Sequence, residues 1–243
     1  VPLLQKLGAT VSLAVQAALV SVLADQWPDV AVAESFADVS GFDLATPLMS
    51  LPLALNTRLE SIPAEVPYLR VDTAEQPVND RPRIGLVWSG STEHKNDKNR
   101  SIPVAALDSL FEQPVDWVCL QPDLRETDLR WLADHPEVPI ERPVLTDFAE
   151  TARIIQGLDW VVTVDTAVAH LAGALGKPVW LLLPTGADYR WLLDRADSPW
   201  YPTARLFRQQ VRGDWMGVVT QLKQAITDTM SGSVSPIKGC SCD

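Results

Sequence analysis

The stretch WVVTVDTAVAHLAGALGKPVWLLLP, residues 160–184, places an acid, a hydroxyl and an imidazole at one polar joint. Asp165 and Thr166 end an apolar run typical of a central parallel strand, and His170 lies about one helical turn beyond Thr166. Because the first amides of a helix and the helix dipole attract anions, this joint is suited to a phosphate. The alternative is structural: Thr166 or Asp165 caps the helix, and His170 packs in the core.

A second polar segment, WSGSTEHKNDKNRS, concentrates basic side chains in an acidic protein. Its basic residues are His94, Lys95, Lys98 and Arg100. Lysine and arginine side chains could neutralise a diphosphate through charge-assisted hydrogen bonds. The alternative is a solvated turn that binds nothing, since loops are commonly polar.

A third segment, PTGADYRWLLDRADSPWYP, combines aromatic rings with charged residues. Tyr189 and Trp191 flank Arg190, an arrangement that suits contacts to a nucleotide base or a sugar ring. The alternative is a small aromatic cluster packed under a long loop.

Apolar and amphipathic runs alternate from residue 83 onward, which predicts a parallel α/β sheet in a doubly wound domain. The expected strands are RIGLVWSG, VDWVCLQ, VPIER, DWVVTVDT and PVWLLLP. The expected helices are IPVAALDSLF, LRETDLRWLADH, DFAETARIIQG and AVAHLAGALG, with a closing amphipathic helix at 214–229. Each of the three polar segments follows an expected strand. We therefore expect them together at the carboxyl edge of the sheet, where such folds bind ligands.

The first 70 residues suggest a second, incomplete domain of the same kind. ATVSLAV and VAVAES are typical of strands, QAALVSVLADQW is typical of a helix, and 41–70 is expected to hold one or two short strands between long loops. The chain opens on a helix, so we expect that it begins inside its fold and is a fragment. The predicted organisation is a partial N-terminal domain (1–70), a linker (71–82), a C-terminal domain (83–213), a closing helix (214–229) and a disordered tail (230–243).

Composition excludes several classes of function. The net charge of −11 argues against an extended nucleic-acid surface. Three cysteines, two of them in the terminal CSC, do not make a disulfide framework and favour a reducing cytoplasm. We expect no metal site, because two tail thiols without partners make a poor one. The apolar stretch 11–24 divides into a strand and a helix, so we expect a soluble protein that does not span a membrane.

At these residues the chain resembles a group of bacterial glycosyltransferases. GLVWSGSTEHKNDKNRSIP, TVDTAVAHLAGALGKPVWLLLP, YRWLLDRADSPWYPTARLFRQ and PLMSLPLALNTRLESIPAEVPYL are similar to glycosyltransferase domains of tetratricopeptide-repeat proteins, related to the family 9 ADP-heptose heptosyltransferases. The resemblance covers roughly residues 1 to 229 and implies a GT-B fold of two Rossmann-like halves. It also implies that a sugar passes from a nucleotide diphosphate donor, bound mainly by the C-terminal half, to a protein or glycan acceptor.

The resemblance also assigns roles to residues. Asp165, Thr166, Ala167 and His170 match the donor-site pattern D-T-x-x-x-H, with the backbone at 166 and 167 around the phosphates. Lys98 or Lys95 would be the phosphate-binding lysine. No cofactor is implied, since the nucleotide sugar is a substrate, and the leaving diphosphate would need no metal.

The resemblance names no catalytic base for this chain. Relatives carry a first strand and a glycine-rich loop that supplies the acidic base, and neither is present here. Thr46 stands where relatives commonly have histidine. We therefore keep two other hypotheses, a nucleotide-sugar-binding or scaffold module without turnover, and an epimerase on the same architecture.

Overall fold

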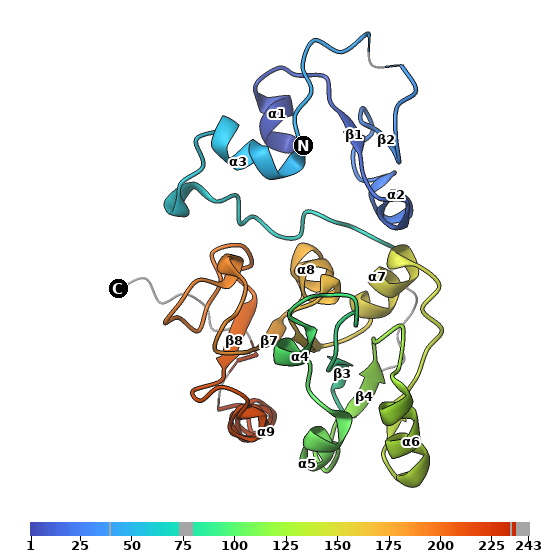
Figure 1. Ribbon diagram of the computed structural model, residues 1–243, viewed down its shortest axis with the longest axis vertical. Coiled ribbons are helices and arrows are strands. Elements are labelled where there is room, and N and C mark those ends of the chain that lie inside the picture. The colour runs from blue at the N-terminus through green and yellow to red at the C-terminus, as the bar shows by residue number, and fades with distance from the viewer. Residues whose placement is uncertain (39, 73–79, 234, 237–243) are drawn as a thin grey trace.

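The computed structural model describes residues 1–38, 40–72, 80–233 and 235–236. Figure 1 shows a smaller N-terminal part above a larger part that begins at residue 80. The predicted linker (71–82) and tail (230–243) lie partly outside the described residues, so their character stays a prediction.

A six-stranded sheet forms the centre of the larger part, and all of its paired strands are parallel. The strand order is β5-β4-β3-β6-β7-β8. The strands are β3 (Arg83–Val87), β4 (Asp116–Cys119), β5 (Ile140–Glu141), β6 (Trp160–Val164), β7 (Val179–Leu183) and β8 (Ala204–Arg208). Numbered within this part, the order is 3-2-1-4-5-6, the order typical of Rossmann folds. The direction of strand succession reverses between β3 and β6.

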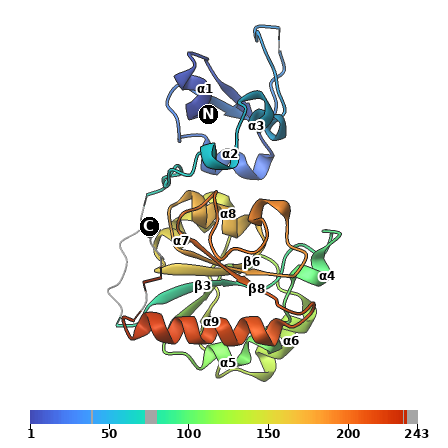
Figure 2. The same ribbon diagram turned by 90° about the vertical axis from the view of Figure 1, so that its left-hand side faces the viewer.

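Helices cover both faces of the sheet, so the predicted parallel α/β class and doubly wound architecture are confirmed for this part. Figure 2 shows α7 and α8 on one face and α9 and α5 on the other. The helices are α4 (Asp97–Arg100), α5 (Asp108–Phe111), α6 (Glu126–Asp134), α7 (Phe148–Gln156), α8 (Ala167–Ala174) and α9 (Trp215–Met230).

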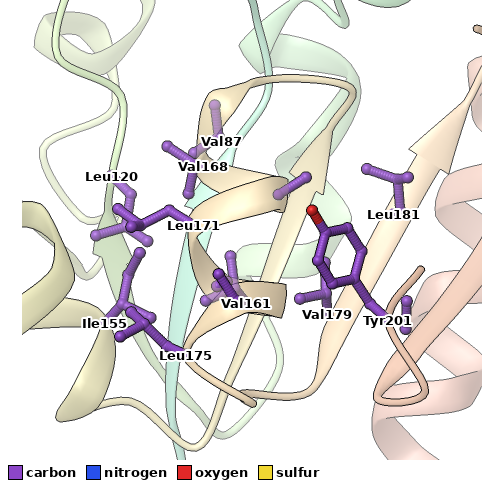
Figure 3. Close-up of a cluster of buried hydrophobic side chains, with 14 of the residues drawn as sticks. Val87, Leu120, Ile155, Val161, Val168, Leu171, Leu175, Val179, Leu181 and Tyr201 are labelled. Atoms are coloured by element: carbon purple, nitrogen blue, oxygen red, sulfur yellow. The ribbon is translucent and has the colours of Figure 1, made fainter. Parts of the chain in front are cut away.

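The sequence of β6 and β7 explains their central place. Every residue of both strands is buried, as expected of strands covered on two faces. Small residues on α8, including Ala169 and Ala172, let this helix approach the sheet closely. Figure 3 shows Leu171 of this helix and Leu175 at its C-cap in a buried cluster with residues of β6, β7 and α7.

Two helices begin at aspartate caps. The Glu150 amide donates to Asp147 Oδ1 (2.8 Å) at the start of α7, and the Gly217 amide donates to Asp214 Oδ1 (2.9 Å) at the start of α9. Each carboxylate satisfies an amide that has no partner within its helix and also favours the helix dipole.

The N-terminal part contains a parallel βαβ unit. Strand β1 (Ser12–Ala14) pairs with β2 (Ala31–Ala33), and α2 (Ala17–Leu23) connects them. Helix α1 (Pro2–Lys6), helix α3 (Leu51–Ala54) and two 3-10 turns (Leu48–Ser50 and Leu59–Ser61) complete this part. Helix α2 contacts α7, and Val22 and Leu69 join the core that covers the α7–α8 face.

Two expectations about secondary structure were wrong, and one strand was missed. Residues 41–70 form short helical turns instead of strands, and prolines at several positions there remove the N–H groups that a strand needs. The helix expected in IPVAALDSLF is a 3-10 turn (Val104–Leu107) followed by α5. Strand β8 was not predicted: two arginines interrupt its short apolar pattern, because an edge strand is only partly buried.

Candidate functional site

Two of the three polar segments meet where the strand order reverses. The segment 89–101 follows β3, and Asp165 and Thr166 follow β6, which pairs with β3. Arg100 Nη1 donates to the main-chain oxygen of Asp165 at 2.7 Å. Ligands of open α/β sheets bind at this position, because the loops diverge there and leave room between them.

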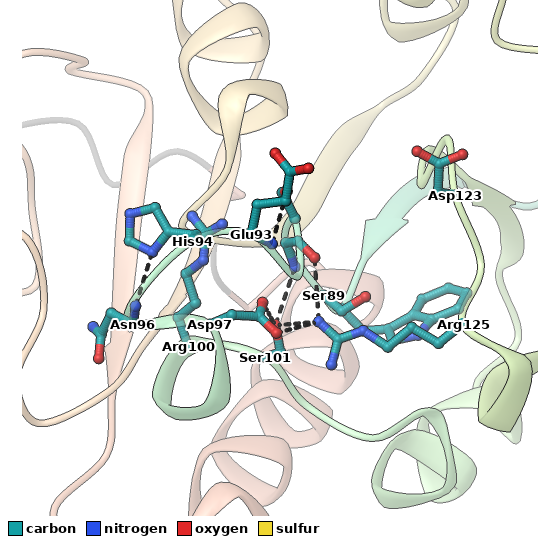
Figure 4. Close-up of polar contacts among 12 residues, drawn as sticks. Ser89, Glu93, His94, Asn96, Asp97, Arg100, Ser101, Asp123 and Arg125 are labelled. Atoms are coloured by element: carbon teal, nitrogen blue, oxygen red, sulfur yellow. Dashed lines mark hydrogen bonds and ion pairs between the residues drawn. The ribbon is translucent and has the colours of Figure 1, made fainter.

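An ion pair and several hydrogen bonds anchor the segment 89–101 (Figure 4). Asp97 Oδ2 accepts from Arg125 Nη2 at 2.7 Å, and Asp97 Oδ1 accepts from the Ser101 hydroxyl at 2.7 Å. The Ser101 oxygen accepts from the Gly90 amide at 3.1 Å, and the Gly90 carbonyl accepts from Arg125 Nη2 at 3.2 Å. Since Asp97 is buried, its charge needs this cation, and the pairing turns the acid away from the exposed lysines beside it.

Gly90 is required by the position of Arg100. A Cβ atom at residue 90 would lie 2.5 Å from Arg100 Cζ and 2.7 Å from Nε, closer than non-bonded atoms approach. The guanidinium therefore lies flat against the Gly90 backbone while it reaches Asp165. These contacts explain why a residue without a side chain stands at position 90, three residues after the end of β3.

The start of α8 leaves its first amides without a side-chain cap. Thr166 is the N-cap residue, but its hydroxyl makes no hydrogen bond to the helix. Its Oγ1 lies 3.1 Å from Thr163 Oγ1, and Thr163 Oγ1 donates to the Val164 carbonyl at 2.7 Å, so Thr166 is the donor to Thr163. Ala167 is exposed at the first helical position. The Thr166 side chain therefore does not cap α8, contrary to the structural alternative. The first amides of the helix remain available to an anion.

His170 is half-buried and its imidazole has fixed neighbours. Nδ1 lies 3.0 Å from the Tyr201 hydroxyl, and the ring stacks on Trp191 with centroids 5.3 Å apart and planes 18° apart. Burial lowers the pKa of His170, although the charge of Asp165 opposes the shift. The imidazole is therefore neutral near pH 7.

The residues 189–191 divide between surface and core. Tyr189 is exposed, and the Arg190 guanidinium lies 4.7 Å from its ring centroid. Arg190 also pairs with Asp188 at 2.8 Å and contacts Met49 Sδ of the N-terminal part at 3.9 Å. Trp191 is 1% exposed, so its faces are occupied by protein and a base could stack on Tyr189 more readily.

The structure thus joins the predicted site residues in two groups. Arg100 contacts Asp165, and His170 contacts Trp191. His94, Lys95 and Lys98 are exposed. In the part of the chain that the structure describes, His94 Nδ1 accepts from the Asn96 amide, and no hydrogen bond joins any of these three to the 165–170 segment.

Sequence reasoning missed residues that organise the site. Arg125 and Asp97 hold the segment 89–101, and Gln121 Oε1 accepts from the Ser89 amide at 3.0 Å where β3 ends. Arg125 lies at the N-cap of α6 and Gln121 just after β4, both at the carboxyl edge of the sheet. That position is a signal the sequence does carry: polar residues directly after a predicted parallel strand.

Three further observations concern metal ligands, cysteines and membrane spans. Within the described ranges, no group of three or more His, Cys, Asp or Glu side chains could hold a metal ion. Burial raises the pKa of Cys119 to about 11, so this thiol is not a reactive nucleophile, and the other two cysteines lie outside the described residues. No described helix has both the length and the apolar character needed to cross a membrane.

Comparison with known proteins points to one family at this site. Residues 140–182 match the model of glycosyltransferase family 9 (heptosyltransferase). The matched stretch runs from β5 to β7 and includes Asp165, Thr166 and His170. Among curated proteins, the chain is similar to Protein FlbA of Caulobacter vibrioides, with 25% identity over 178 residues. The similarity covers 71% of this chain and 29% of FlbA, so the chain spans less than a third of that relative's length.

Solved structures with some similarity include two E. coli heptosyltransferases. WaaC with ADP has 14% identity and a TM-score of 0.44, over 65% of this chain and 46% of WaaC. ADP-heptose lps heptosyltransferase II has 16% identity and a TM-score of 0.40, over 62% of this chain and 48% of the enzyme. The chain therefore spans under half the length of either enzyme, and its similarity in sequence to the family 9 model is confined to β5 through β7.

Proposed function

We propose that this chain binds a nucleotide diphosphate sugar at the carboxyl ends of β3 and β6 and takes part in transfer of the sugar to an acceptor hydroxyl. The acceptor is a protein or glycan. The proposal includes a GT-B-like arrangement in which the larger part carries the donor, and a location in the cytoplasm. It also includes the association with tetratricopeptide-repeat proteins that the sequence resemblance implies.

One observation carries this proposal. The hydrogen bond from Arg100 to the Asp165 carbonyl joins the basic segment to the family 9 motif at the point where the strand order reverses. A ligand there would meet uncapped helix amides from one side and cations from the other.

The chemistry follows from the groups at this edge. As the glycosidic bond breaks, negative charge develops on the leaving diphosphate. The amides at Thr166 and Ala167 and the ammonium of Lys98 or Lys95 would stabilise that charge without a metal ion. An acceptor hydroxyl that attacks from the opposite face of the sugar would invert the anomeric carbon. Tyr189 and Arg190 are exposed or half-exposed and would contact the base or the sugar.

Isothermal titration with UDP, ADP and their sugars tests the donor proposal. We expect dissociation constants below millimolar for at least one nucleotide diphosphate, and weaker binding by about tenfold for Lys98→Ala if it forms a charge-assisted contact. Arg130→Ala is the matched control, because Arg130 is exposed on α6 and pairs only with its helix neighbour Glu126 in the described contacts. Absence of binding to every nucleotide diphosphate at millimolar concentration would end the proposal.

A second candidate is a nucleotide-sugar-binding module without turnover. It is favoured by the contacts that the N-terminal part makes with the site-bearing segments. Tyr68 and Met49 make polar contacts there, and neither is a carboxylate or an imidazole that could serve as general base. Product analysis with radiolabelled nucleotide sugars separates the two candidates: released nucleotide together with hydrolysed or transferred sugar indicates an enzyme, and binding alone indicates the module.

A further inference from the structure

Several side chains fix the position of the His170 imidazole. Trp191 stacks on its ring, Tyr201 contacts Nδ1, and the hydroxyl of Tyr68 interacts with that of Tyr201. Trp191 and Tyr201 come from the segment after β7, whereas Tyr68 comes from the N-terminal part. Such a setting determines the orientation of the imidazole and leaves Nε2 as its remaining polar atom.

Close packing holds Tyr201 in this position. Tyr201 is 8% exposed, and its ring lies on α8 at Gly173, where a Cβ atom would come within 2.5 Å of ring atom Cδ1. The Tyr68 and Leu69 amides both donate to the Ala174 carbonyl, at 2.9 and 3.1 Å, which fixes the segment that carries Tyr68 against the end of the same helix. The hydroxyl of Tyr201 therefore has little freedom to leave Nδ1.

Hydrogen-bond chemistry indicates which group is the donor between Tyr201 and Nδ1 of His170. A phenol is a better donor than acceptor, and an unprotonated imidazole nitrogen is a better acceptor than a phenol oxygen. The favoured series therefore has Tyr201 donating to Nδ1. In the reverse series Nδ1 would donate to Tyr201, Tyr201 would donate toward Tyr68, and Nε2 would carry a lone pair able to accept a proton.

We propose that Tyr201 is a positioning residue that donates its hydroxyl proton to Nδ1 of His170 and so holds the neutral imidazole in the tautomer with its proton on Nε2. Nε2–H then donates a hydrogen bond to an acceptor oxygen of the ligand, a phosphate or sugar oxygen. His170 is accordingly not the general base. The identity of the ligand rests on the proposed function, whereas the tautomer does not.

The surroundings of His170 are consistent with a neutral ring. Burial lowers its pKa, and burial also raises the pKa of Tyr201, so both groups stay uncharged near pH 7. The charged groups that act on the imidazole are Asp165, just before its helix, and Asp188 and Arg190 on the segment packed against it. One cation and two acids oppose each other there, so no single neighbour forces protonation.

Nitrogen-15 NMR of the imidazole side chains tests the tautomer directly. The chain has three histidines, so His94→Gln and His135→Gln assign the third signal to His170. We expect a protonated, pyrrole-type shift for Nε2 and an unprotonated, pyridine-type shift for Nδ1 in the wild-type protein at neutral pH. Equal populations, or a proton on Nδ1, in the wild-type protein would overturn the proposal.

Two tyrosine variants distinguish the two proton series. Tyr68→Phe leaves the bond from Tyr201 to Nδ1 intact, so the tautomer should not change. In the reverse series, the same variant frees the Tyr201 proton and moves the histidine proton from Nδ1 to Nε2. Tyr201→Phe should shift the Nδ1 resonance toward that of an imidazole with no donor, and a Nδ1 signal identical to wild type would contradict the assignment.

Ligand binding then tests the role of Nε2–H. Glutamine can place an amide N–H near the position of Nε2, so His170→Gln should bind nucleotide diphosphates within about threefold of wild type, while His170→Ala should lose about tenfold. Tyr201→Phe should weaken binding about fivefold, the effect of one neutral hydrogen bond. Equal losses in the glutamine and alanine variants would reject the donor role. If the wild type binds no nucleotide, the proposed function fails, and the tautomer is still decided by the NMR measurement.

Discussion

Substituting alanine for Gly90 tests whether the two loops depend on each other. The added Cβ would lie 2.5 Å from Arg100 Cζ, so the guanidinium has to move and its 2.7 Å hydrogen bond to the Asp165 carbonyl is lost. A hydrogen bond with one charged partner contributes about 1.5–3 kcal/mol, and partial exposure of Arg100 places the expected loss at the lower end. We expect Gly90→Ala to reduce the free energy of unfolding by about 1.5 kcal/mol.

A double-mutant cycle in urea unfolding separates this effect from a backbone effect. In Arg100→Ala protein the Cβ at residue 90 meets no guanidinium, so the double variant should be no less stable than Arg100→Ala alone. Gly41→Ala is the matched control, because nothing lies within 4 Å of its Cβ, and it should be neutral or slightly stabilising. Additive losses at 90 and 100, or a Gly90→Ala protein as stable as Gly41→Ala, would refute the reasoning.

Three further predictions concern the surrounding packing and charge. Gly173→Ala should destabilise the protein by about 1–3 kcal/mol in urea unfolding, because its Cβ would overlap the packed Tyr201 ring, and wild-type stability would contradict this. Arg125→Met should cost about 3 kcal/mol in urea unfolding at pH 7, because it leaves the buried Asp97 carboxylate without its cation, and wild-type stability would contradict this. Burial lowers the folded-state pKa of His170 below the unfolded value of 6.5, so the unfolded chain binds the proton more tightly and stability should fall as pH drops below about 6.5. His170→Gln should remove that part of the pH dependence, and an unchanged slope between pH 7.5 and 5.5 would contradict it.

The β6–α8–β7 unit could be predicted from the sequence because its pattern is extreme. Runs such as WVVTV and VWLLL fit only a strand buried on both faces, and a single polar joint between them marks the carboxyl edge. The meeting of Arg100 with Asp165 follows from the same logic, since adjacent parallel strands bring their ends together.

The sequence alone could not predict which charged residues of the segment 89–101 face the protein and which face solvent. Within the short helix α4 and the turn before it, Arg100 and Asp97 face the protein while Lys95 and Lys98 face solvent. This choice depends on Arg125, which reaches the segment from another loop and which no local pattern links to it.

The aromatic segment after β7 shows a similar limit. Local composition suggested three surface contacts, yet Trp191 is buried against His170 while its neighbour Tyr189 is exposed. Arg208 on β8 holds the chain here, donating to the carbonyls of Trp191 (2.5 Å) and Arg195 (2.9 Å). Because β8 was not predicted, the contacts of its Arg208 were not predicted either, and these contacts help to determine which ring is buried.

Mapping ligand binding on the backbone amides tests the central claim most directly. Titration of ADP and UDP into nitrogen-15-labelled protein should shift the amide resonances of Thr166 and Ala167 together with those of residues 90–100. A depression of about 310 Å³ between β8 and α9, lined by Arg205, Gln224 and Asp228 among others, provides an internal comparison far from the motif in sequence. Shifts confined to that depression, or no shift at millimolar nucleotide, would contradict a phosphate site between β3 and β6.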